Sequence, residues 1–360
     1  MKKYFLPFIL SSFLLLTACN KATSDNQLPM LKKEEGHPSP TEEQPSSKET
    51  FLTGTFLQLF GKDDWSPSQW EQYLLELKEL RIHTLIVQYT AFKNAYNDIT
   101  WFDSQNTFTI QKSKNTLARL LKVAENQGIE VYLGLYFDET YWQHQADASW
   151  LELHARYCIE IAQELQSQFG NSKAFKGWYI PHEPEPDAYH TDEKIALFRD
   201  VFINPITHKL HQWSNKPIAI AAFWNSALTS PEQLQHFMAE LSKSPLNIIM
   251  LQDGVGAGHV TLEQLKTYYL SAEKGLFVEN PNYKGAFWTD LETFAYTPTP
   301  PYPPATFDRV EQQLMIELAI PRIRKAVSFQ YYDDMSSWSP NKAQADDLRN
   351  KYQLMLNKIK

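Results

Sequence analysis

Between Phe51 and Lys360 the sequence alternates eight times between a short apolar run and a longer amphipathic segment. The apolar runs have the length and composition of buried strands, and the segments after them have the periodicity of helices with one apolar face. This alternation is typical of a parallel sheet made of βα units. Eight units in a segment of this length predict an α/β fold of the (β/α)8 TIM-barrel class, in one domain.

The approximate bounds of the predicted strands are Leu52–Leu59, Thr84–Tyr89, Glu130–Phe137, Gly177–Pro181, Pro217–Phe223, Asn247–Gln252, Gly285–Leu291 and Ala326–Tyr332. Each strand is followed by a predicted helix, at Ser68–Leu80, Thr116–Gln127, Ala148–Phe169, Asp192–Gln212, Pro231–Leu241, Leu262–Ser271, Thr306–Ile320 and Lys342–Lys358. Helix starts are predicted where serine can cap and proline can take the first helical position, at Ser66-Pro67, Ser230-Pro231 and Ser339-Pro340. Gly128 is predicted to end the second helix.

The glycine pattern argues against an open nucleotide-binding sheet, which would usually carry a glycine-rich turn after its first strand. The first turn here, Gln58–Trp65, has no such fingerprint. The cluster Gly254–Gly258 follows the sixth predicted strand, and an active-site loop explains it better than a phosphate-binding loop does. We therefore expect no nucleotide cofactor.

The first eighteen residues have the pattern of a bacterial lipoprotein signal peptide. A basic start is followed by the apolar run Tyr4–Leu16 and then by Leu16-Thr17-Ala18-Cys19. The apolar run is too short for a confident membrane span but has the length of a signal-peptide core. We expect cleavage before Cys19, lipidation of Cys19, and anchoring to a membrane of the bacterial cell envelope, on its periplasmic or extracellular face.

Residues 19–50 are predicted to be a disordered tether, because they are rich in Lys, Glu, Ser, Pro and Thr and lack apolar periodicity. Residues 51–360 would form the barrel domain. The net charge of −8 argues against a nucleic-acid-binding surface. Aromatic residues make up 14% of the sequence, which is typical of a site that stacks on sugar rings and also of an aromatic core.

The chemistry of a TIM barrel lies at the carboxyl ends of its strands. In this chain those ends are rich in amide, carboxylate and aromatic side chains, which favours a ligand cleft. The predicted substrate-binding residues are Gln58, Gln88, Tyr136, Trp178, His182, Trp224, Asn225, Gln252, Asp253, Trp288, Asp290 and Tyr331. Rings that could stack on sugars are Trp178, Trp224, Trp288 and Tyr331, and candidates for hydroxyl recognition are Gln88, His182, Asn225 and Gln252.

Two carboxylates on separate strands are the minimum machinery for hydrolysis of a glycosidic bond. Glu183 follows the fourth strand and is bracketed by Pro181 and Pro184, which hold its backbone rigidly. In the seventh strand a period of two puts Trp288, Asp290 and Glu292 on one face. Glu292 is the preferred second carboxylate because it lies nearer the end of the strand, and Asp290 is the alternative.

The chain resembles two groups of proteins. Acidic residues after strands four and seven resemble the retaining glycosidases of the large barrel clan, although His182-Glu183-Pro184 stands where that clan has Asn-Glu-Pro. The segments Gly54–Gln58, Gly177–Pro181 and Phe287–Glu292 look like a bacterial family of uncharacterised, glycosidase-like barrel domains. The resemblance implies a TIM barrel, with Glu183 as acid/base and Glu292 as nucleophile.

The leading prediction is a glycoside hydrolase that acts on an oligosaccharide or polysaccharide at the cell envelope. The alternative is a non-catalytic lipoprotein that binds glycans with the same residues. A carboxyl separation of about 5 Å would indicate retention and about 6.5–9.5 Å inversion. We expect no metal, because the ten histidines are scattered and only His182 and His259 lie near the predicted site. The sugar, its linkage and the oligomeric state stay open.

Overall fold

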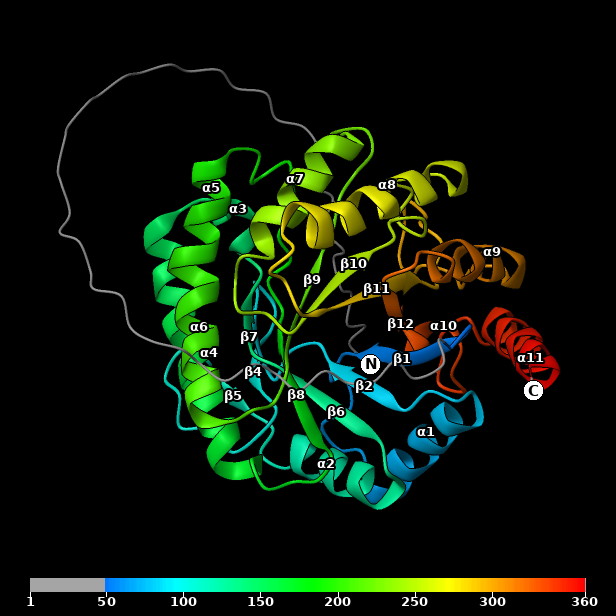
Figure 1. The fold of residues 1–360 in the computed structure, drawn as a ribbon. Helices are drawn as coiled ribbons and strands as arrows, with labels where there is room; N and C mark the ends of the chain where they lie inside the picture. The colour runs from blue at the N-terminus through cyan, green and yellow to red at the C-terminus, as the bar shows by residue number, and fades with distance from the viewer. Residues whose placement is uncertain (1–48, 360) are drawn as a thin grey trace, which may run out of the picture.

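A computed structural model describes residues 49–359, and in it eight parallel strands form a closed barrel (Figure 1). The order around the barrel is β1, β12, β11, β10, β9, β8, β6 and β2, and β2 pairs with β1 to close it. This confirms the predicted fold class. The predicted signal peptide, Cys19 and nearly all of the predicted tether lie outside the described residues. The barrel strands are β1 (Leu52–Leu57), β2 (Thr84–Val87), β6 (Glu130–Gly134), β8 (Phe175–Ile180), β9 (Ile218–Ala222), β10 (Ile248–Gln252), β11 (Ala286–Glu292) and β12 (Ile323–Phe329).

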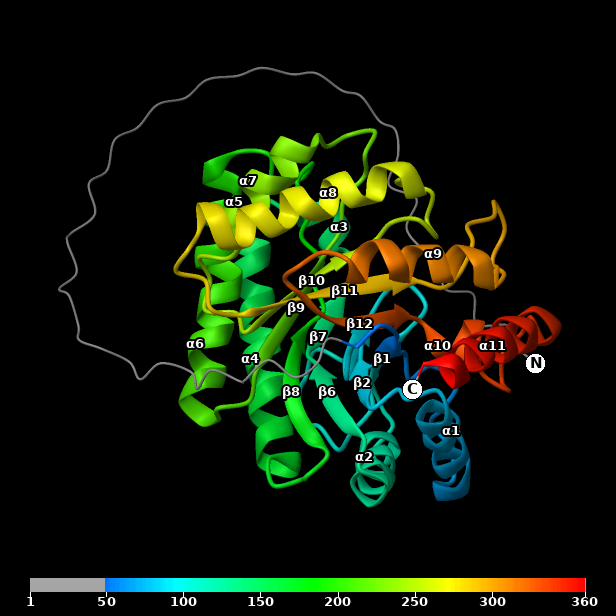
Figure 2. The same cartoon turned by 45° about the vertical axis from the view of Figure 1, so that its right-hand side comes forward.

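Helices surround the barrel, as both views show (Figures 1 and 2). The long ones are α1 (Pro67–Glu79), α2 (Thr116–Gln127), α4 (Ala148–Phe169), α6 (Asn204–Trp213), α7 (Pro231–Leu241), α8 (Leu262–Lys274), α9 (Phe307–Leu318) and α11 (Lys342–Lys358). Shorter ones are α3 (Tyr141–His144), α5 (Asp192–Leu197) and α10 (Tyr331–Asp334). Two π-helical turns, η1 (Phe198–Ile203) and η2 (Gly275–Glu279), adjoin α6 and α8.

The helix ends follow the sequence signals at most positions. Ser66 and Ser230 each form a capping box, and Gly128 ends α2 with φ of 72°. Ser339 does not cap α11, which begins at Lys342 after Asn341; its hydroxyl instead accepts a hydrogen bond from the Asn341 amide. The pair Ser339-Pro340 therefore precedes the helix and does not start it.

One predicted helix, Asp192–Gln212, is divided into α5, η1 and α6. Pro205 explains the division, because it has no N–H to donate to the Val201 carbonyl four residues earlier. The π-helical turn η1 lies directly before Pro205 and takes up this mismatch. The eighth predicted strand was also placed too late: β12 ends at Phe329, and the chain turns into α10 from Tyr331.

A second sheet that the sequence reading missed lies beside the barrel. Its order is β5 (Gln111–Lys112), β4 (Asp98–Thr100), β3 (Ala91–Lys93) and β7 (Tyr136–Asp138). The predicted strand Glu130–Phe137 leaves the barrel after Gly134. A Cβ at Gly134 would lie 2.1 Å from the Gln88 carbonyl oxygen, so the close approach of the two chains there requires glycine.

The apolar core has two parts. A large cluster fills the space between the strands and the helices. A smaller one fills the inside of the barrel and includes Phe56, Ile86, Tyr132, Tyr179, Ala219, Met250, Trp288, Val327 and Phe329. Within residues 49–359, none of the helices combines the length and the apolar character that crossing a membrane requires.

Candidate functional site at the carboxyl end of the barrel

The alternation of side chains along the strands decides which residues reach the barrel interior. Tyr179 in β8, Met250 in β10 and Trp288 in β11 belong to the interior cluster. A period of two places Glu183, Gln252, Asp290 and Glu292 on the same inward side, at the carboxyl end. The register supports this, because Gln252 pairs with Asp290. The sequence-predicted carboxylates are thus brought to one end of the barrel.

Glu183 follows β8 and is only partly buried. Its carboxylate is hydrogen bonded to Gln252, and the Tyr141 hydroxyl donates to its backbone carbonyl at 3.2 Å. Burial raises the pKa of Glu183 to about 7, and the charge of Glu185 adds to this, while the hydrogen bond from Gln252 opposes it. A carboxyl with a pKa near neutral pH can both give and take a proton there, which suits a general acid/base.

Glu292 ends β11 and is 5% exposed. Its Oε2 accepts a hydrogen bond from the Ala257 amide at 2.6 Å, and the Gly256 amide is a second donor. Burial raises the pKa of Glu292, and Asp253 adds to the increase, while the two amides and the charge of Arg309 oppose it. The donors around Glu292 favour its ionised form but do not offset burial and the charge of Asp253, which together raise its pKa to about 8.

The predicted loop Gly254–Gly258 is the source of these amides. A Cβ at Gly256 would lie 2.7 Å from the Glu292 Cβ and 2.9 Å from Oε2, so only glycine lets the loop come this close. Gly254 and Gly258 have positive φ of 71° and 74°, which turn the loop toward the barrel. The glycine cluster therefore lets backbone amides of the loop reach the carboxylate of Glu292.

Asp290 is buried, and it is close enough to Glu183, Glu292 and Asp253 to interact with their charges. Burial raises its pKa well above the usual range, and the charges of Glu183, Glu292 and Asp253 add to the effect. Its Oδ1 has no hydrogen-bond partner among the described residues. Asp290 Oδ1 thus lacks the backbone donors that hold the Glu292 carboxylate, which disfavours Asp290 as the second carboxylate.

The two predicted glutamines Gln58 and Gln88 lie together. Both follow inward-facing positions, of β1 and β2 respectively, and both are buried. The Gln58 Nε2 donates to the Gln88 Oε1 at 2.7 Å. Each amide still has a second donor or acceptor available to a ligand.

Three of the four predicted stacking rings have no exposed face for a sugar. Trp178 points outward from β8, packs on Phe175, and donates to the Ser214 hydroxyl at 3.3 Å. Trp224 stacks on Tyr268 with ring centroids 4.0 Å apart and donates to the Gln252 carbonyl. Tyr331 is fully buried and donates to Glu76. These rings belong to the packing between strands and helices, and we leave them out of the proposed site.

Trp288 lies inside the barrel, below Asp290. Its ring packs on Tyr132, with centroids 5.9 Å apart, and the Lys325 ammonium lies 4.7 Å from its centroid. Tyr136 lies in the second sheet, where it stacks on His154 and donates to Asp138 at 3.2 Å. Neither ring lies at the open end of the barrel, which corrects their predicted contact with substrate.

His182 faces away from the barrel interior, one position out of phase with Glu183. It is fully buried among Phe137, Tyr141 and Phe202, and neither ring nitrogen has a hydrogen-bond partner among the described residues. Burial lowers its pKa well below the usual value. The predicted hydroxyl recognition by His182 is therefore replaced by a packing role beneath Glu183.

Asp253 and Asn225 also serve the protein itself. Asp253 is fully buried behind Glu292, where it accepts hydrogen bonds from the Val255 amide and the Gln313 side chain and is bonded to Glu317. Asn225 is partly exposed, and its side-chain oxygen accepts from the Ala227 amide at 2.9 Å. Asp253 positions the loop beside Glu292 and does not reach the barrel interior.

Several residues near the carboxylates were not predicted. Phe223 is partly exposed and directly follows β9, in phase with its inward-facing residues, and its amide donates to the Pro184 carbonyl beside Glu183. Its ring lies 5.7 Å from that of Trp142 and 6.3 Å from that of His259. Continuing the period of two from Ala219 through Ala221 would have found Phe223.

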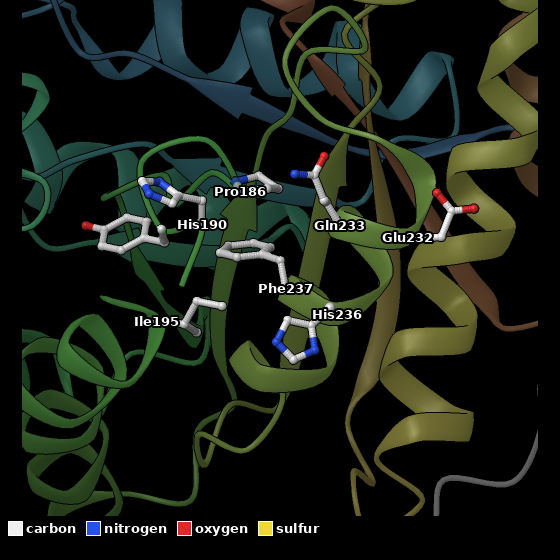
Figure 3. Close-up of a pocket in the computed structure, with 8 residues that line it drawn as sticks. Pro186, His190, Ile195, Glu232, Gln233, His236 and Phe237 are labelled. Atoms are coloured by element: carbon white, nitrogen blue, oxygen red, sulfur yellow. The ribbon is translucent and has the colours of Figure 1, made fainter. Parts of the chain in front are cut away.

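A pocket of about 220 Å³ lies beside this end of the barrel, between the loop after β8 and the start of α7 (Figure 3). Figure 3 shows Pro186, Gln233 and Phe237 among the side chains that line it, with the Gln233 amide pointing toward Pro186. Pro186, the first of its lining residues along the chain, comes three residues after Glu183, and neither Glu183 nor Glu292 lines the pocket. Among the described residues, no group of three or more His, Cys, Asp or Glu side chains could hold a metal ion.

Solved structures with a similar fold include several glycosidases. A protein from Bacteroides thetaiotaomicron VPI-5482, provisionally described as an alpha-L-fucosidase, has a TM-score of 0.70 and 22% identity, over 91% of this chain and 99% of that one. The hyperthermostable endo-1,4-beta-D-mannanase from Thermotoga petrophila RKU-1 has a TM-score of 0.55 and 10% identity, over 84% and 99% of the two chains. At these identities the likeness shows the fold alone.

Two comparisons concern sequence. The uncharacterized protein YbcH of Escherichia coli (strain K12) is 24% identical over 205 residues, which are 56% of this chain and 64% of YbcH, so the match spans less than two thirds of that relative. The family model described as "Domain of unknown function (DUF4434)" matches residues 52–344, from the first barrel strand into the last helix. The chain therefore belongs to the DUF4434 family.

Proposed function

We propose that the protein is a glycoside hydrolase whose active site lies at the carboxyl end of the barrel. The observation that carries the proposal is the placement of Glu183, after the fourth barrel strand, and Glu292, at the end of the seventh, on inward positions in unlike surroundings. Glu183 has a neutral amide as its partner and a raised pKa. Glu292 has two backbone amides and a nearby arginine. Groups with such different environments divide into acid and nucleophile.

In the proposed reaction the Glu183 carboxyl gives its proton to the glycosidic oxygen as the bond from that oxygen to the anomeric carbon breaks. The Glu292 carboxylate forms a bond to the anomeric carbon, which leaves a glycosyl ester. A water molecule then attacks the same carbon, Glu183 takes its proton, and Glu292 leaves as a carboxylate. This sequence retains the anomeric configuration.

The fold likeness to glycosidases supports the reaction class and does not identify the sugar. The predicted lipid anchor at Cys19 would place the enzyme at the bacterial cell envelope. Both the substrate and the location are part of the proposal. Detection of a diacylglycerol-modified Cys19 by mass spectrometry of the protein from bacterial membranes would test the location.

One observation favours a second candidate, a lipoprotein that binds glycans without cleaving them. Burial raises the pKa values of Glu292 and Asp290 as well as that of Glu183. Protonated carboxyls can hold sugar hydroxyls by hydrogen bonds, and a protonated Glu292 would be a poor nucleophile.

The test compares the wild type with Glu183→Gln, Glu292→Gln and the control Asp187→Asn, an exposed acid in the same loop as Glu183. Each is assayed on soluble polysaccharides, on p-nitrophenyl glycosides and on 2,4-dinitrophenyl glycosides. Loss of the acid should cost about 10²–10⁴-fold on unactivated substrates, and less on dinitrophenyl glycosides, whose leaving group needs no proton. Loss of the nucleophile should abolish turnover of every substrate.

Full activity in either glutamine variant would overturn the assignment of that residue. If the wild type turns over none of the substrates, and a polysaccharide retards all four proteins equally in affinity electrophoresis, the glycan-binding candidate replaces the enzyme.

A further inference from the structure

The loop between β11 and α9 carries aromatic rings from the barrel interior to the surface. It begins directly after Glu292, and Phe294 pairs with Pro304 across it. The Tyr296 amide donates to the Gly256 carbonyl at 2.8 Å, which joins this loop to the one that holds Glu292. The position of the rings is therefore tied to the position of the proposed nucleophile.

Four rings follow one another along this path. Phe294 meets Phe329 of the barrel interior edge to face, with centroids 6.4 Å apart. Tyr302 stacks on Phe294 at 5.6 Å with an interplanar angle of 24°, and Tyr296 lies 5.5 Å from Tyr302. Exposure increases along the series, since Phe294 is buried, Tyr302 is partly exposed and Tyr296 is 43% exposed.

A purely structural role would not require Tyr296 to be exposed to solvent. An aromatic ring that only stabilised the loop would gain most by burying both faces. Here the outermost ring, Tyr296, keeps much of its surface in water, next to the partly exposed Tyr302. Aromatic rings present flat apolar faces with a polar hydroxyl at the edge, which complements a sugar ring with its apolar C–H face and its peripheral hydroxyls.

The lack of charged residues in the loop indicates which class of ligand it would bind. From Thr293 to Ala305 the loop contains no Lys, Arg, Asp or Glu. Its surface consists of tyrosine, proline and threonine side chains, and the whole chain has a net charge of −8. These properties suit an uncharged glycan and disfavour a polyanion such as a uronic acid polymer.

We propose that Tyr296 and Tyr302 bind sugar units of an uncharged oligosaccharide or polysaccharide, outward from the unit held between Glu183 and Glu292. The inference rests on the proposed function, because it takes the carboxylates as the reacting end of the site. It adds that the substrate is a chain of several units, which contacts the protein beyond the cleaved bond. A single glycoside would not reach the tyrosines.

The experiment uses the full chain and the variants Tyr296→Ala, Tyr302→Ala and Tyr296→Phe. The control is Tyr96→Ala, which removes an 81% exposed tyrosine from the turn between β3 and β4, in the second sheet. Affinity electrophoresis in gels with mannan, xylan, laminarin or carboxymethylcellulose, the last being the anionic probe, measures binding. Initial rates on p-nitrophenyl monoglycosides and on the matching tetra- to hexasaccharides measure turnover.

Loss of one stacking ring should weaken binding of the neutral polysaccharide about 3- to 10-fold, as expected for one aromatic stacking contact. Turnover of hexasaccharides should fall by a similar factor, with monoglycosides unchanged. Tyr296→Phe keeps the ring and should keep most of the affinity, and Tyr96→Ala should match the wild type. Circular dichroism of each variant confirms that it is folded.

The inference and the proposed function fail in different ways. Active protein whose Tyr296→Ala and Tyr302→Ala variants treat long and short substrates as the wild type does would overturn the inference alone. Inactive protein whose neutral-glycan binding still depends on both tyrosines would overturn the proposed hydrolysis and keep the tyrosine site. Tighter binding of carboxymethylcellulose than of every neutral polymer would refute the predicted ligand class.

Discussion

Substitution of Gly256 by alanine should damage the proposed nucleophile and leave the barrel folded. Gly256 has no left-handed φ, so alanine meets no backbone strain there, and the effect comes from space alone. The new methyl group would lie 2.6 Å from the Phe294 carbonyl oxygen, 2.7 Å from the Glu292 Cβ and 2.9 Å from its Oε2. Two of these three neighbours belong to Glu292, so the loop and the carboxylate must move apart.

The magnitude follows from the hydrogen bond that this movement breaks. To reach ordinary contact at 3.4 Å, the loop must move by several tenths of an ångström. The Ala257 amide moves with it, and its 2.6 Å bond to Oε2 lengthens toward the limit of about 3.2 Å. A hydrogen bond to a charged group contributes about 1.5–3 kcal/mol, and about 1.4 kcal/mol is tenfold in rate. We expect kcat/KM to fall roughly 10- to 150-fold.

The assay measures kcat/KM on a hydrolysed substrate together with the thermal midpoint. Gly258→Ala is the matched control, because nothing lies within 4 Å of its added Cβ while its φ of 74° disfavours alanine. The control should lose stability, by about 1 kcal/mol or more, without displacing Glu292. Wild-type kcat/KM in Gly256→Ala, or an equal loss in both folded variants, would refute the link between the loop and Glu292.

Three further predictions concern stability. The pKa of Glu183 is about 7 in the folded protein and 4.5 for a free side chain, so between these pH values the folded protein keeps a proton that the unfolded chain releases, and stability falls as pH rises. In Glu183→Gln the thermal midpoint should therefore change less over this pH range than in the wild type. An unchanged slope would contradict the raised pKa. Asp253 and Glu317 are buried carboxyls joined by a hydrogen bond, and burial raises the pKa of both. Glu317→Gln removes one of them, so the stability of the variant should fall less than that of the wild type as pH rises above 4.5, the ordinary pKa of glutamate. An equal fall in the same assay would show that the pair does not resist ionisation. Trp224→Ala should cost about 3–5 kcal/mol in the free energy of unfolding in urea, since the ring is buried against Tyr268; a cost below about 1 kcal/mol would show that the ring is dispensable to packing.

The fold could be predicted from the sequence because its signals are periodic and repeated. Six barrel strands begin within a residue of the predicted position, and α2, α4, α7 and α11 have the predicted bounds. The second sheet was missed because β3, β4 and β5 are only two or three residues long. Strands this short give no alternation to detect, and pairing with neighbours decides their structure.

The placement of Glu183 and Glu292 was predictable, whereas most of the predicted aromatic contacts were not. In β11 the period of two was applied, and Trp288, Asp290 and Glu292 share a face as expected. Along β8 and the residues after it, the same period puts Tyr179 and Glu183 on the inward side and Trp178 and His182 on the outward side. All of them except Tyr179 were predicted to lie at the site, because they are near the end of one strand. Composition near a strand end does not say which side of the barrel a ring faces.

Loop contacts were the least predictable part. Nothing in the sequence joins Gly256 or Ala257 to Glu292, thirty-five residues after Ala257, because the contact depends on how two loops pack above neighbouring strands. The glycine spacing indicated a loop with special geometry and did not indicate its partner. Tyr296 and Tyr302 are likewise unremarkable in a proline-rich loop until their ring series is seen.

The two proposed catalytic carboxyls are held in place by different means, and this has a consequence for their roles. The backbone of Glu183 is fixed by flanking prolines, by packing of His182 and by the Tyr141 hydroxyl, and none of these groups stabilises a charge on its carboxyl. The carboxyl itself is hydrogen bonded to a neutral amide, that of Gln252. Glu292 is fixed through the carboxylate itself, by amides that favour the charged form. A group held by its backbone can gain and lose a proton without losing its position, as an acid/base must. A group held by donors to its oxygens keeps its orientation best while it is ionised, as a nucleophile must between turnovers. The geometry therefore favours Glu183 as the acid/base over the reverse assignment, even though burial raises the pKa of both.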